Sequence, residues 1–227
     1  MILKDVENIS HVFRHINFEP KNIFDLGANV GQFTIDFART FTHAHVFSFE
    51  PIANTFKELE QNVVSSQIGP RIHLYNFGLS DEKKTMNLGK PRDRKDRDSN
   101  SGLYSSYYSR EGDFDIKECK FVNLNEFCND NNVYPDLIKM DIEGHEFEVL
   151  NTIKGDTLQA ATAILVEVNC DERFPDPTDV ATLLVSSGFE SVYPPLDFVP
   201  PPSTRNPKRL KAFNRLWLRT DKFIVRK

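Results

Sequence analysis

A glycine-rich turn, DLGANVG from Asp25 to Gly31, carries the clearest chemical signal in the sequence. Glycines at such a turn let the backbone bend sharply and let a ligand approach without a Cβ in the way. The spacing differs from the G-x-G-x-x-G fingerprint of dinucleotide-binding proteins, which disfavours a pyrophosphate cradle. Asp25 would repel a phosphate but would attract a cationic amine or sulfonium. The turn therefore predicts a site for a ligand without phosphates.

A second signal is Glu50, which ends another apolar segment 25 residues after Asp25 and is followed by Pro51. An acidic side chain at this place can accept hydrogen bonds from both ribose hydroxyls of an adenosine ligand. Taken alone, Glu50 is better explained as an exposed strand end. Combined with the glycine turn, it favours the ribose role.

The third signal is the segment KMDIEGHE, residues 139–146, in which three carboxylates and a histidine crowd together. Asp141 and His145 are the main acid/base candidates, because imidazole titrates near neutral pH and can accept a hydroxyl proton. Glu143 lies between them and completes the predicted catalytic set. The alternatives are a capping or solvent-facing role for His145 and a helix-capping role for Glu146, since anions favour helix N-termini.

A divalent cation is a less favoured reading of the same region. Asp141, Glu167 and Asn169 are expected at neighbouring strand ends and carry the oxygen ligands that such ions prefer. Polar residues are also common at strand ends without any ion. The sequence leaves a metal undecided.

A sheet must position these residues, because short apolar runs alternate with helical patterns, as is typical of βαβ units in an α/β fold. We expect about seven strands, with helices between the first six. The expected strands lie at 22–28, 44–50, 72–78, 136–141, 163–169, 189–195 and 222–227. A further strand and a short helix are expected within 117–127. The last strand follows its neighbour without a helical crossover, so we expect it to be antiparallel. Such a sheet binds ligands beyond the carboxyl ends of its strands.

The composition indicates an ordinary globular protein. The 227 residues include 28 Lys and Arg, 33 Asp and Glu and 39% hydrophobic residues, which excludes collagen-like and disordered classes. At roughly 150 residues per domain, we predict a single domain over residues 1–227. No apolar run reaches the roughly 20 residues of a membrane span, and no signal peptide is recognisable, so we expect a cytoplasmic protein. The three cysteines lack metal-ligand spacing and are expected to be free thiols.

Two regions depart from this pattern. Residues 88–114 are charged and then rich in Ser and Tyr, without periodicity, which predicts a lid or substrate-binding insertion or, equally, a mobile surface loop. Residues 203–227 hold nine Lys and Arg and one Asp, a net charge of +8 against −13 for the rest of the chain. A basic region can bind nucleic acid. Because the acidic remainder would repel a polyanion, we favour a solvated strand region and expect no nucleic-acid partner.

Together these segments resemble the FkbM family of S-adenosylmethionine-dependent methyltransferases. The matching segments are DLGANVGQFT (25–34), FEP (49–51), NFGLSD (76–81), SNSGLYSS (99–106) and KMDIEGHEFEVL (139–150). The resemblance implies a Rossmann-like class I methyltransferase fold, with a seven-stranded mostly parallel sheet, an antiparallel last strand and helices on both faces. The cofactor-binding residues that it implies are Asp25, Gly27, Ala28, Asn29, Gly31 and Thr34 in the turn segment, Glu50 and Pro51 at the ribose, Gly78 and Leu79 near the adenine, and Asp141.

Members of this family commonly methylate hydroxyl groups, often on sugars, so the resemblance implies O-methyl transfer to a small molecule or glycan, with a sugar preferred. The expected chemistry is in-line attack of a substrate oxygen on the sulfonium methyl, with His145 or Asp141 removing the proton. Two alternatives remain open. One is a nucleic-acid 2′-O-methyltransferase, which is weakened by the lack of any Lys between Gly155 and Pro207. The other is a non-catalytic module that binds an adenosyl ligand. The sequence does not determine the oligomeric state, and a homodimer is compatible with it.

Overall fold

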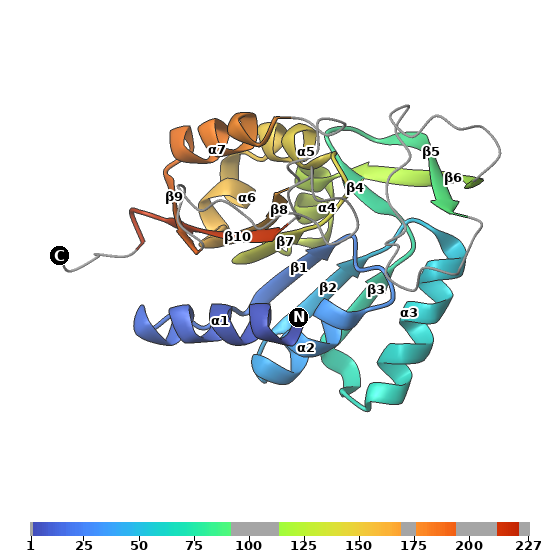
Figure 1. Ribbon diagram of the computed structural model, residues 1–227, viewed down its shortest axis with the longest axis horizontal. Helices are drawn as coiled ribbons and strands as arrows, with labels where there is room; N and C mark the ends of the chain where they lie inside the picture. Colours follow the sequence, from blue (N-terminus) through green and yellow to red (C-terminus); the bar gives the residue numbers. More distant parts are fainter. Residues whose placement is uncertain (1, 92–113, 169–175, 194–212, 223–227) are drawn as a thin grey trace, which may run out of the picture.

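The computed structural model describes residues 2–91, 114–168, 176–193 and 213–222, which form a central sheet with helices on both faces (Figure 1). The strands of the sheet are β1 (Asn22–Leu26), β2 (His45–Phe49), β3 (Ile72–Tyr75), β7 (Leu137–Met140), β8 (Ala163–Val168), β9 (Phe189–Tyr193) and β10 (Phe213–Arg219). Their order is β3-β2-β1-β7-β8-β10-β9. All pairs from β3 to β8 are parallel, whereas β10 is antiparallel to both of its neighbours. This confirms the predicted seven-stranded α/β sheet with an antiparallel last strand.

The strand order reverses beside β1, which pairs with β2 on one side and β7 on the other. In open α/β sheets, ligands bind beyond the carboxyl ends of the strands at such a reversal. Backbone hydrogen bonds tie the three loops together there: the amides of Gly27 and Ala28 donate to the carbonyl of Phe49, and the amide of Asp141 donates to that of Leu26. The topology therefore brings the glycine turn, Glu50 and the 139–146 segment to one place.

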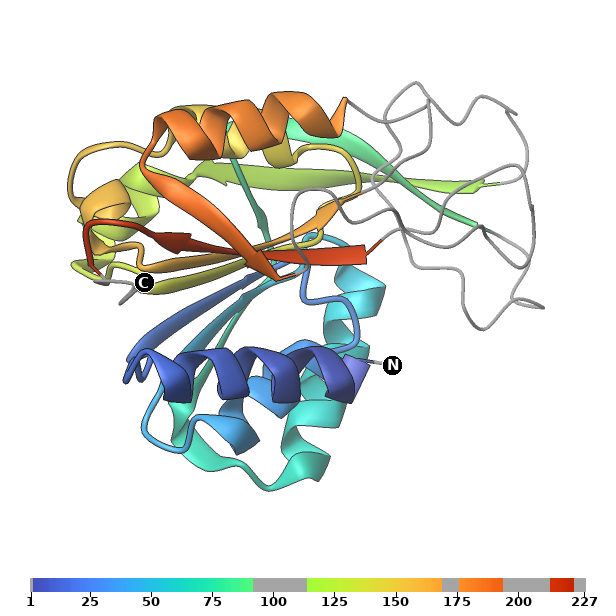
Figure 2. The same cartoon turned by 60° about the vertical axis from the view of Figure 1, so that its left-hand side comes forward.

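One face of the sheet is covered by α1 (Ile2–His15), α2 (Gln32–Thr40) and α3 (Ala53–Ser66), which lie below it in Figure 2. A 3-10 turn, η1 (Gly69–Arg71), leads from α3 into β3. Phe33 and Phe37 lie four residues apart in α2, and both are buried in the core on this face of the sheet. The sequence analysis missed α1, although Val6, Ile9 and Phe13 recur at helical spacing and are buried in the same core.

The opposite face carries α4 (Leu124–Asn131), α5 (Glu146–Thr152), α6 (Gly155–Ala160) and α7 (Pro177–Ser186) (Figure 2). Its core is built around an aromatic group in which the rings of Phe24, Phe49 and Phe127 lie 5.0 to 5.8 Å apart. Trp217 of β10 is buried in the same core. This packing holds the helix that follows the 139–146 segment firmly against the sheet.

A second, three-stranded sheet was not predicted. It consists of β4 (Gly78–Ser80), β5 (Lys84–Pro91) and β6 (Phe114–Asn123), in the order β4-β6-β5, and lies at the upper right of Figure 1. The strand expected at 72–78 is thus divided between the two sheets, because β3 ends at Tyr75. Of the expected insertion at 88–114, residues 88–91 and 114 belong to β5 and β6, and 92–113 lie outside the described residues.

The expected strand at 222–227 is untested over most of its length, and the sequence analysis did not predict β10. The last strand in the described chain is β10, and Lys222 lies in a turn after it, whereas residues 223–227 are outside the described residues. Residues 215–218 of β10 are buried, because this strand is inserted between β8 and β9 and is covered on both faces.

Cys119 and Cys128 are buried free thiols, as expected, and Cys170 lies outside the described residues. Within the described ranges, we find no helix with the length and apolar character required to span a bilayer.

Candidate functional site

A hollow lies at the carboxyl ends of β1, β2 and β7, where the strand order reverses. It is lined by seven of the residues nominated from the sequence, Gly27, Glu50, Pro51, Gly78, Leu79, Asp141 and Glu143. Four lining residues were missed: Ile52, Leu88, Phe121 and Ile142. Leu88 and Phe121 come from the second sheet. The sequence analysis did not nominate them, because the pairing of β5 with β6 that carries them to the hollow is not visible in a local pattern.

The glycine turn is bent tightly behind this hollow. Gly27, Asn29 and Gly31 adopt left-handed backbone conformations, with φ of 76°, 50° and 91°. A Cβ on Gly27 would lie 2.0 Å from the carbonyl oxygen of Asp141, so only glycine lets the β1 and β7 loops approach this closely. Ala28 is buried, and Ala28, Asn29 and Gly31 are not among the residues that line the hollow.

Glu50 closes the turn from the side of β2. Its carboxylate is only 4% exposed and accepts hydrogen bonds from the amide of Asn29 (3.1 Å) and from the amide of Ile52 (2.9 Å). A carboxylate offers about four acceptor positions, and Glu50 is one of the residues that line the hollow. Glu50 therefore combines a structural role with an acceptor at the ligand site.

Asp25 lies beneath the turn and does not line the hollow. Its carboxylate is fully buried, with Oδ1 at 3.1 Å from Nζ of Lys139, and Oδ2 accepts a 2.7 Å hydrogen bond from the hydroxyl of Thr34. Lys139 also approaches Asp141 (3.7 Å) and donates to the carbonyl of Gly27 (3.2 Å). Asp25 and Lys139 are opposite each other in the β1–β7 register, which explains the pairing. The cation that Asp25 meets is thus Lys139 rather than a ligand.

The charge of Lys139 is maintained although the residue is only 1% exposed. Burial alone would lower the pKa of its ammonium group, but the adjacent carboxylates of Asp25 and Asp141 outweigh that effect, and the pKa is raised. The ammonium therefore remains protonated and ties the turn to the β7 loop.

Glu146 shapes the loop that follows β7. It is the first residue of α5, and its buried carboxyl group accepts hydrogen bonds from the amides of Ile142 (3.0 Å) and Gly144 (2.9 Å). Between them, Glu143 adopts a left-handed conformation with φ of 56°. The expected helix-start role of Glu146 is present, and it presents Glu143 to the hollow.

Asp141, Glu143 and Glu167 bring their carboxylate oxygens within 4.8 Å of one another. Burial, reinforced by the negative charges of Asp141 and Glu146, raises the pKa of Glu143 to about 8. The same causes raise the pKa of Glu167 well above its usual value. Asn169, the third oxygen ligand considered from the sequence, lies outside the described residues. Burial and the neighbouring negative charges thus make the carboxyl groups of Glu143 and Glu167 weaker acids than ordinary glutamates.

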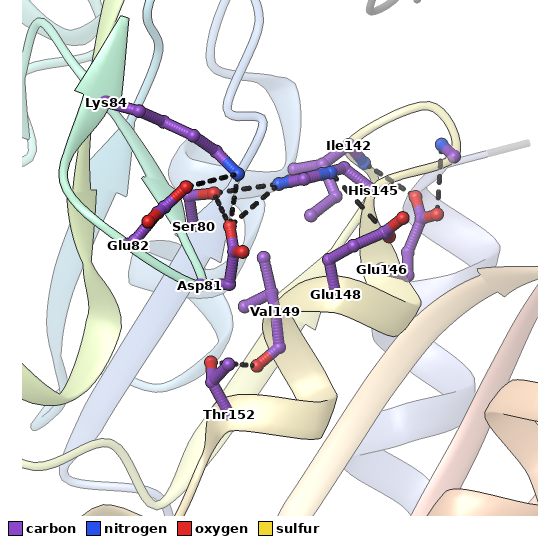
Figure 3. Close-up of polar contacts among 11 residues, drawn as sticks. Ser80, Asp81, Glu82, Lys84, Ile142, His145, Glu146, Glu148, Val149 and Thr152 are labelled. Carbon is purple, nitrogen blue, oxygen red and sulfur yellow. Dashed lines mark hydrogen bonds and ion pairs between the residues drawn. The ribbon is translucent and has the colours of Figure 1, made fainter.

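The imidazole of His145 is in contact with Ser80, Asp81 and Glu148 (Figure 3). Its Nε2 lies 2.8 Å from the hydroxyl of Ser80, and its Nδ1 lies 3.6 Å from Glu148. Ser80 donates its hydroxyl proton to Asp81 (2.6 Å), so it accepts from Nε2–H of His145. Burial lowers the pKa of His145. Nε2 is therefore engaged, and His145 is not among the residues that line the hollow.

Asp81 anchors this arrangement. Burial raises the pKa of Asp81, but hydrogen bonds from Lys84 and Ser80 outweigh that effect and lower the pKa to about 2. Lys84 also forms an ion pair with Asp81. Ser80 and Asp81 belong to the NFGLSD segment, which was singled out for the cofactor; their contact with His145 depends on the position of β4 beside α5.

The hollow has two chemically different ends. Leu79, Leu88 and Phe121 form an apolar wall that suits a flat heterocycle, whereas Glu50, Asp141 and Glu143 form an acidic wall that suits hydroxyl groups and a cationic centre. Such a lining suits a ligand that has both an apolar ring and polar or positively charged groups.

Comparisons with known proteins agree with this geometry. Residues 25–191 match the model of the methyltransferase FkbM domain. Methyltransferase 1 of Beauveria bassiana is 26% identical over 194 residues, covering 79% of this chain and 76% of the relative. The hexuronic acid methyltransferase AglP of Haloferax volcanii is 29% identical over 163 residues, covering 71% of this chain and 60% of the relative.

Among solved structures, a putative O-methyltransferase from Klebsiella pneumoniae superposes with a TM-score of 0.53 at 12% identity, covering 96% of this chain and 80% of that one. This likeness supports the fold. The family match extends from the glycine turn through β9 and includes both walls of the hollow. The chain therefore belongs to the FkbM family of S-adenosylmethionine-dependent methyltransferases.

Proposed function

We propose that this methyltransferase transfers a methyl group to a hydroxyl of a small molecule or glycan, and that the acceptor is a sugar. The observation that carries the proposal is the pair of carboxyl groups, Asp141 and Glu143, that face the cofactor hollow. Carboxylates both accept hydrogen bonds from sugar hydroxyls and remove a hydroxyl proton. The similarity to a hexuronic acid methyltransferase supports a sugar acceptor.

The residues present fit the cofactor. The apolar wall, with Leu79, Leu88 and Phe121, accommodates the adenine, and the carboxylate of Glu50, which lines the hollow, accepts hydrogen bonds from the ribose hydroxyls. The acidic end accommodates the positive charge of the methionine portion. When bound, S-adenosylmethionine supplies an electrophilic methyl group on sulfur.

The protein's part in the reaction is to align the acceptor oxygen and take its proton. We assign proton removal to Asp141 or Glu143. A pKa of about 8 places Glu143 near the working pH, which suits a general base. The O–H bond breaks as the new O–CH3 bond forms and the S–CH3 bond breaks, and the proton passes to the carboxylate. Because Nε2 of His145 is engaged by Ser80, we assign His145 to positioning the 141–146 loop.

The first test is calorimetric titration with S-adenosylmethionine, followed by methyl transfer to neutral hexoses, hexuronic acids and a phenol. We expect binding that is lost in Glu50→Ala, and a sugar product that carries one methyl ether. Alkali treatment distinguishes an ether, which is stable, from a methyl ester formed on the carboxyl group of a hexuronic acid.

The matched control is Glu60→Gln, which changes an exposed carboxylate on α3 and should leave both binding and transfer unchanged. Glu143→Gln should retain cofactor binding and lose most of the transfer rate. Transfer only to a carboxylate, to nitrogen or to RNA would contradict the proposal.

A further inference from the structure

The side chain of His145 makes contacts that its place in the chain does not require. His145 is the residue before α5, yet its side chain forms no capping hydrogen bond, and the carboxyl group of Glu146 receives the loop amides instead. The imidazole is 14% exposed, and its Nε2 lies 2.8 Å from the hydroxyl of Ser80, which is fully buried (Figure 3). The imidazole therefore serves a contact outside its own helix.

This contact joins the two walls of the hollow. Ser80 ends β4 directly after Leu79 of the apolar wall, which is supported by the second sheet. His145 ends the loop after β7, which carries the acidic wall. Among the described residues, the polar contact between β4 and this loop is the one from Ser80 to His145. The imidazole is therefore the polar link between the two walls.

The carboxylate of Asp81 sets the direction of the hydrogen bonds in this link. Ser80 gives its one hydroxyl proton to Asp81 at 2.6 Å, so its oxygen accepts from Nε2–H of His145. Despite burial, hydrogen bonds from Lys84 and Ser80 lower the pKa of Asp81 to about 2, so this acceptor stays ionised. The side chain of Asn123 on β6 donates to the carbonyl of Asp81 and anchors it in the second sheet. We call this chain of hydrogen bonds, from His145 through Ser80 to Asp81, the relay.

The relay keeps its direction in both protonation states of the ring. Burial lowers the pKa of His145 below its ordinary value, so the ring is mainly neutral at neutral pH and carries its proton on Nε2. A second proton at lower pH goes to Nδ1, which lies 3.6 Å from Oε2 of Glu148. That oxygen is buried and has no hydrogen-bond partner among the described residues, so it can accept the new N–H. Nε2–H therefore points to Ser80 in either state.

The loop that His145 holds includes a residue in an unfavourable backbone conformation. Glu143 has a φ of 56°, which a non-glycine residue keeps only where its surroundings impose it. On one side the amide of Asp141 is bonded to the end of β1, and Glu146 receives two amides within the loop. On the other side the loop is tied to Ser80 through His145. Fixing both sides holds the carboxyl group of Glu143 at one place in the hollow.

We propose that Ser80 and Asp81 are positioning residues for methyl transfer and act through His145. Their relay holds the loop with Asp141 and Glu143 at a fixed place beside the apolar wall. This inference rests on the proposed function, because it takes these two carboxyl groups as the acceptors of the substrate proton. Misplacing a reacting group by about 1 Å can lower a rate about a hundredfold. The relay should therefore affect the transfer rate more than the affinity for the cofactor, to which other parts of the hollow contribute.

The test compares two replacements of His145 that keep different nitrogen positions. The amide nitrogen of Gln lies near the position of Nε2 and that of Asn near the position of Nδ1, so His145→Gln can still donate to Ser80 and His145→Asn cannot. We expect His145→Gln to keep kcat for a hexose or hexuronic acid within about threefold, and His145→Asn and Ser80→Ala to lose about tenfold or more. Glu60→Gln, on the exposed surface of α3, is the control and should transfer like the unmodified protein.

Two further measurements separate positioning from a general loss of structure. The affinity for S-adenosylhomocysteine, measured by calorimetry, should stay within about threefold in all of these variants. Urea unfolding followed by the fluorescence of Trp217 reports whether each variant is folded. A drop in affinity that parallels the drop in kcat would overturn the proposal, because the relay would then serve the whole hollow rather than the loop.

A base role and a space-filling role for His145 give different results. If His145 took the substrate proton itself, the Gln and Asn variants would both be inactive, and if it only filled space they would be equally active; either result would overturn the proposal. The pH profile of kcat should be the same for His145→Gln as for the unmodified protein, because a carboxyl group takes the proton. A profile that loses its acidic limb in this variant would also overturn the proposal.

Nuclear magnetic resonance separates this inference from the proposed function, because it needs no substrate. The proton on Nε2 of His145 is bonded to a buried hydroxyl, so it should exchange slowly and give a proton–nitrogen signal that is absent from His145→Gln and lost in Ser80→Ala. Sugar methylation by a protein without this signal would overturn the relay and leave the methyltransferase function intact. A signal that depends on Ser80, in a protein that never methylates a sugar, would support the relay and overturn the proposed acceptor.

Discussion

Replacing Lys139 by methionine tests the ion pair that joins the glycine turn to the β7 loop. The side chains of Lys139 and Asp25 are 2% and 0% exposed, and their charged atoms lie 3.1 Å apart. Methionine fills similar space but leaves the Asp25 carboxylate with the Thr34 hydroxyl as its remaining partner among the described residues, in a fully buried site. Removing one partner of a buried pair costs about 3–5 kcal/mol in the free energy of unfolding. At about 2–4 °C per kcal/mol for a chain of this size, the melting temperature should fall by about 6–20 °C.

The assay is urea unfolding followed by the fluorescence of Trp217, which is the only tryptophan in the chain and is 1% exposed. The double variant Asp25→Asn/Lys139→Met removes the uncompensated charge, so we expect it to recover at least half of the lost stability. Lys57→Met, on the exposed surface of α3, serves as the control and should unfold with the unmodified protein.

Two results would refute this reasoning. If Lys139→Met unfolds within about 1 kcal/mol of the unmodified protein, the pair does not stabilise the turn. If the double variant is less stable than Lys139→Met, the destabilisation does not arise from an unpaired Asp25 carboxylate.

Three further predictions follow from the contacts around the hollow. Glu50→Ala leaves the amides of Asn29 and Ile52 without this acceptor, which should lower the free energy of unfolding by about 2–6 kcal/mol. The same variant should weaken S-adenosylmethionine binding more than tenfold, and unchanged affinity in calorimetry would exclude the ribose role. Gly78→Ala places a Cβ 2.2 Å from the Phe121 ring, so we expect the overpacking to lower the free energy of unfolding by about 1–3 kcal/mol and to weaken cofactor binding. Adding Phe121→Leu should relieve both effects, and a double variant without such relief would argue against the contact. The pKa of Asp81 is lowered to about 2, so its contribution to stability is complete above its unfolded value of 3.8 and is lost as the pH falls toward 2. The midpoint of urea unfolding should therefore depend less on pH in this window for Asp81→Asn than for the unmodified protein, and equal slopes would contradict the assignment.

Much of the fold could be predicted because its signals are local. Alternation of short apolar runs with helical spacing located the parallel strands and α2, and the lack of a crossover before the last strand predicted its antiparallel direction. The glycine turn was recognisable because left-handed φ values and the 2.0 Å approach to Asp141 require glycine at position 27. Residues nominated at strand ends came together because the ends of parallel strands share one edge of the sheet.

Other features of the fold depend on strand pairing between segments that are far apart in the sequence, and a local sequence pattern does not reveal such pairing. The strand at 213–219 was not found from the sequence, because β10 is defined by its place between β8 and β9, where its residues 215–218 are buried. The second sheet exists because β4 pairs with β6, and it supplies the apolar wall of the hollow.

The partners of individual charges were likewise decided by the tertiary structure. Asp25 appeared from the sequence to face a cationic ligand, but the β1–β7 register places Lys139 against it. His145 is engaged by Ser80, 65 residues earlier in the chain, because β4 lies beside α5. The sequence by itself determined which chemical groups this protein has and at which edge of the sheet they gather. Which donors and cations each carboxylate meets was decided only in three dimensions, because that depends on which segments the fold brings within a few ångströms of one another.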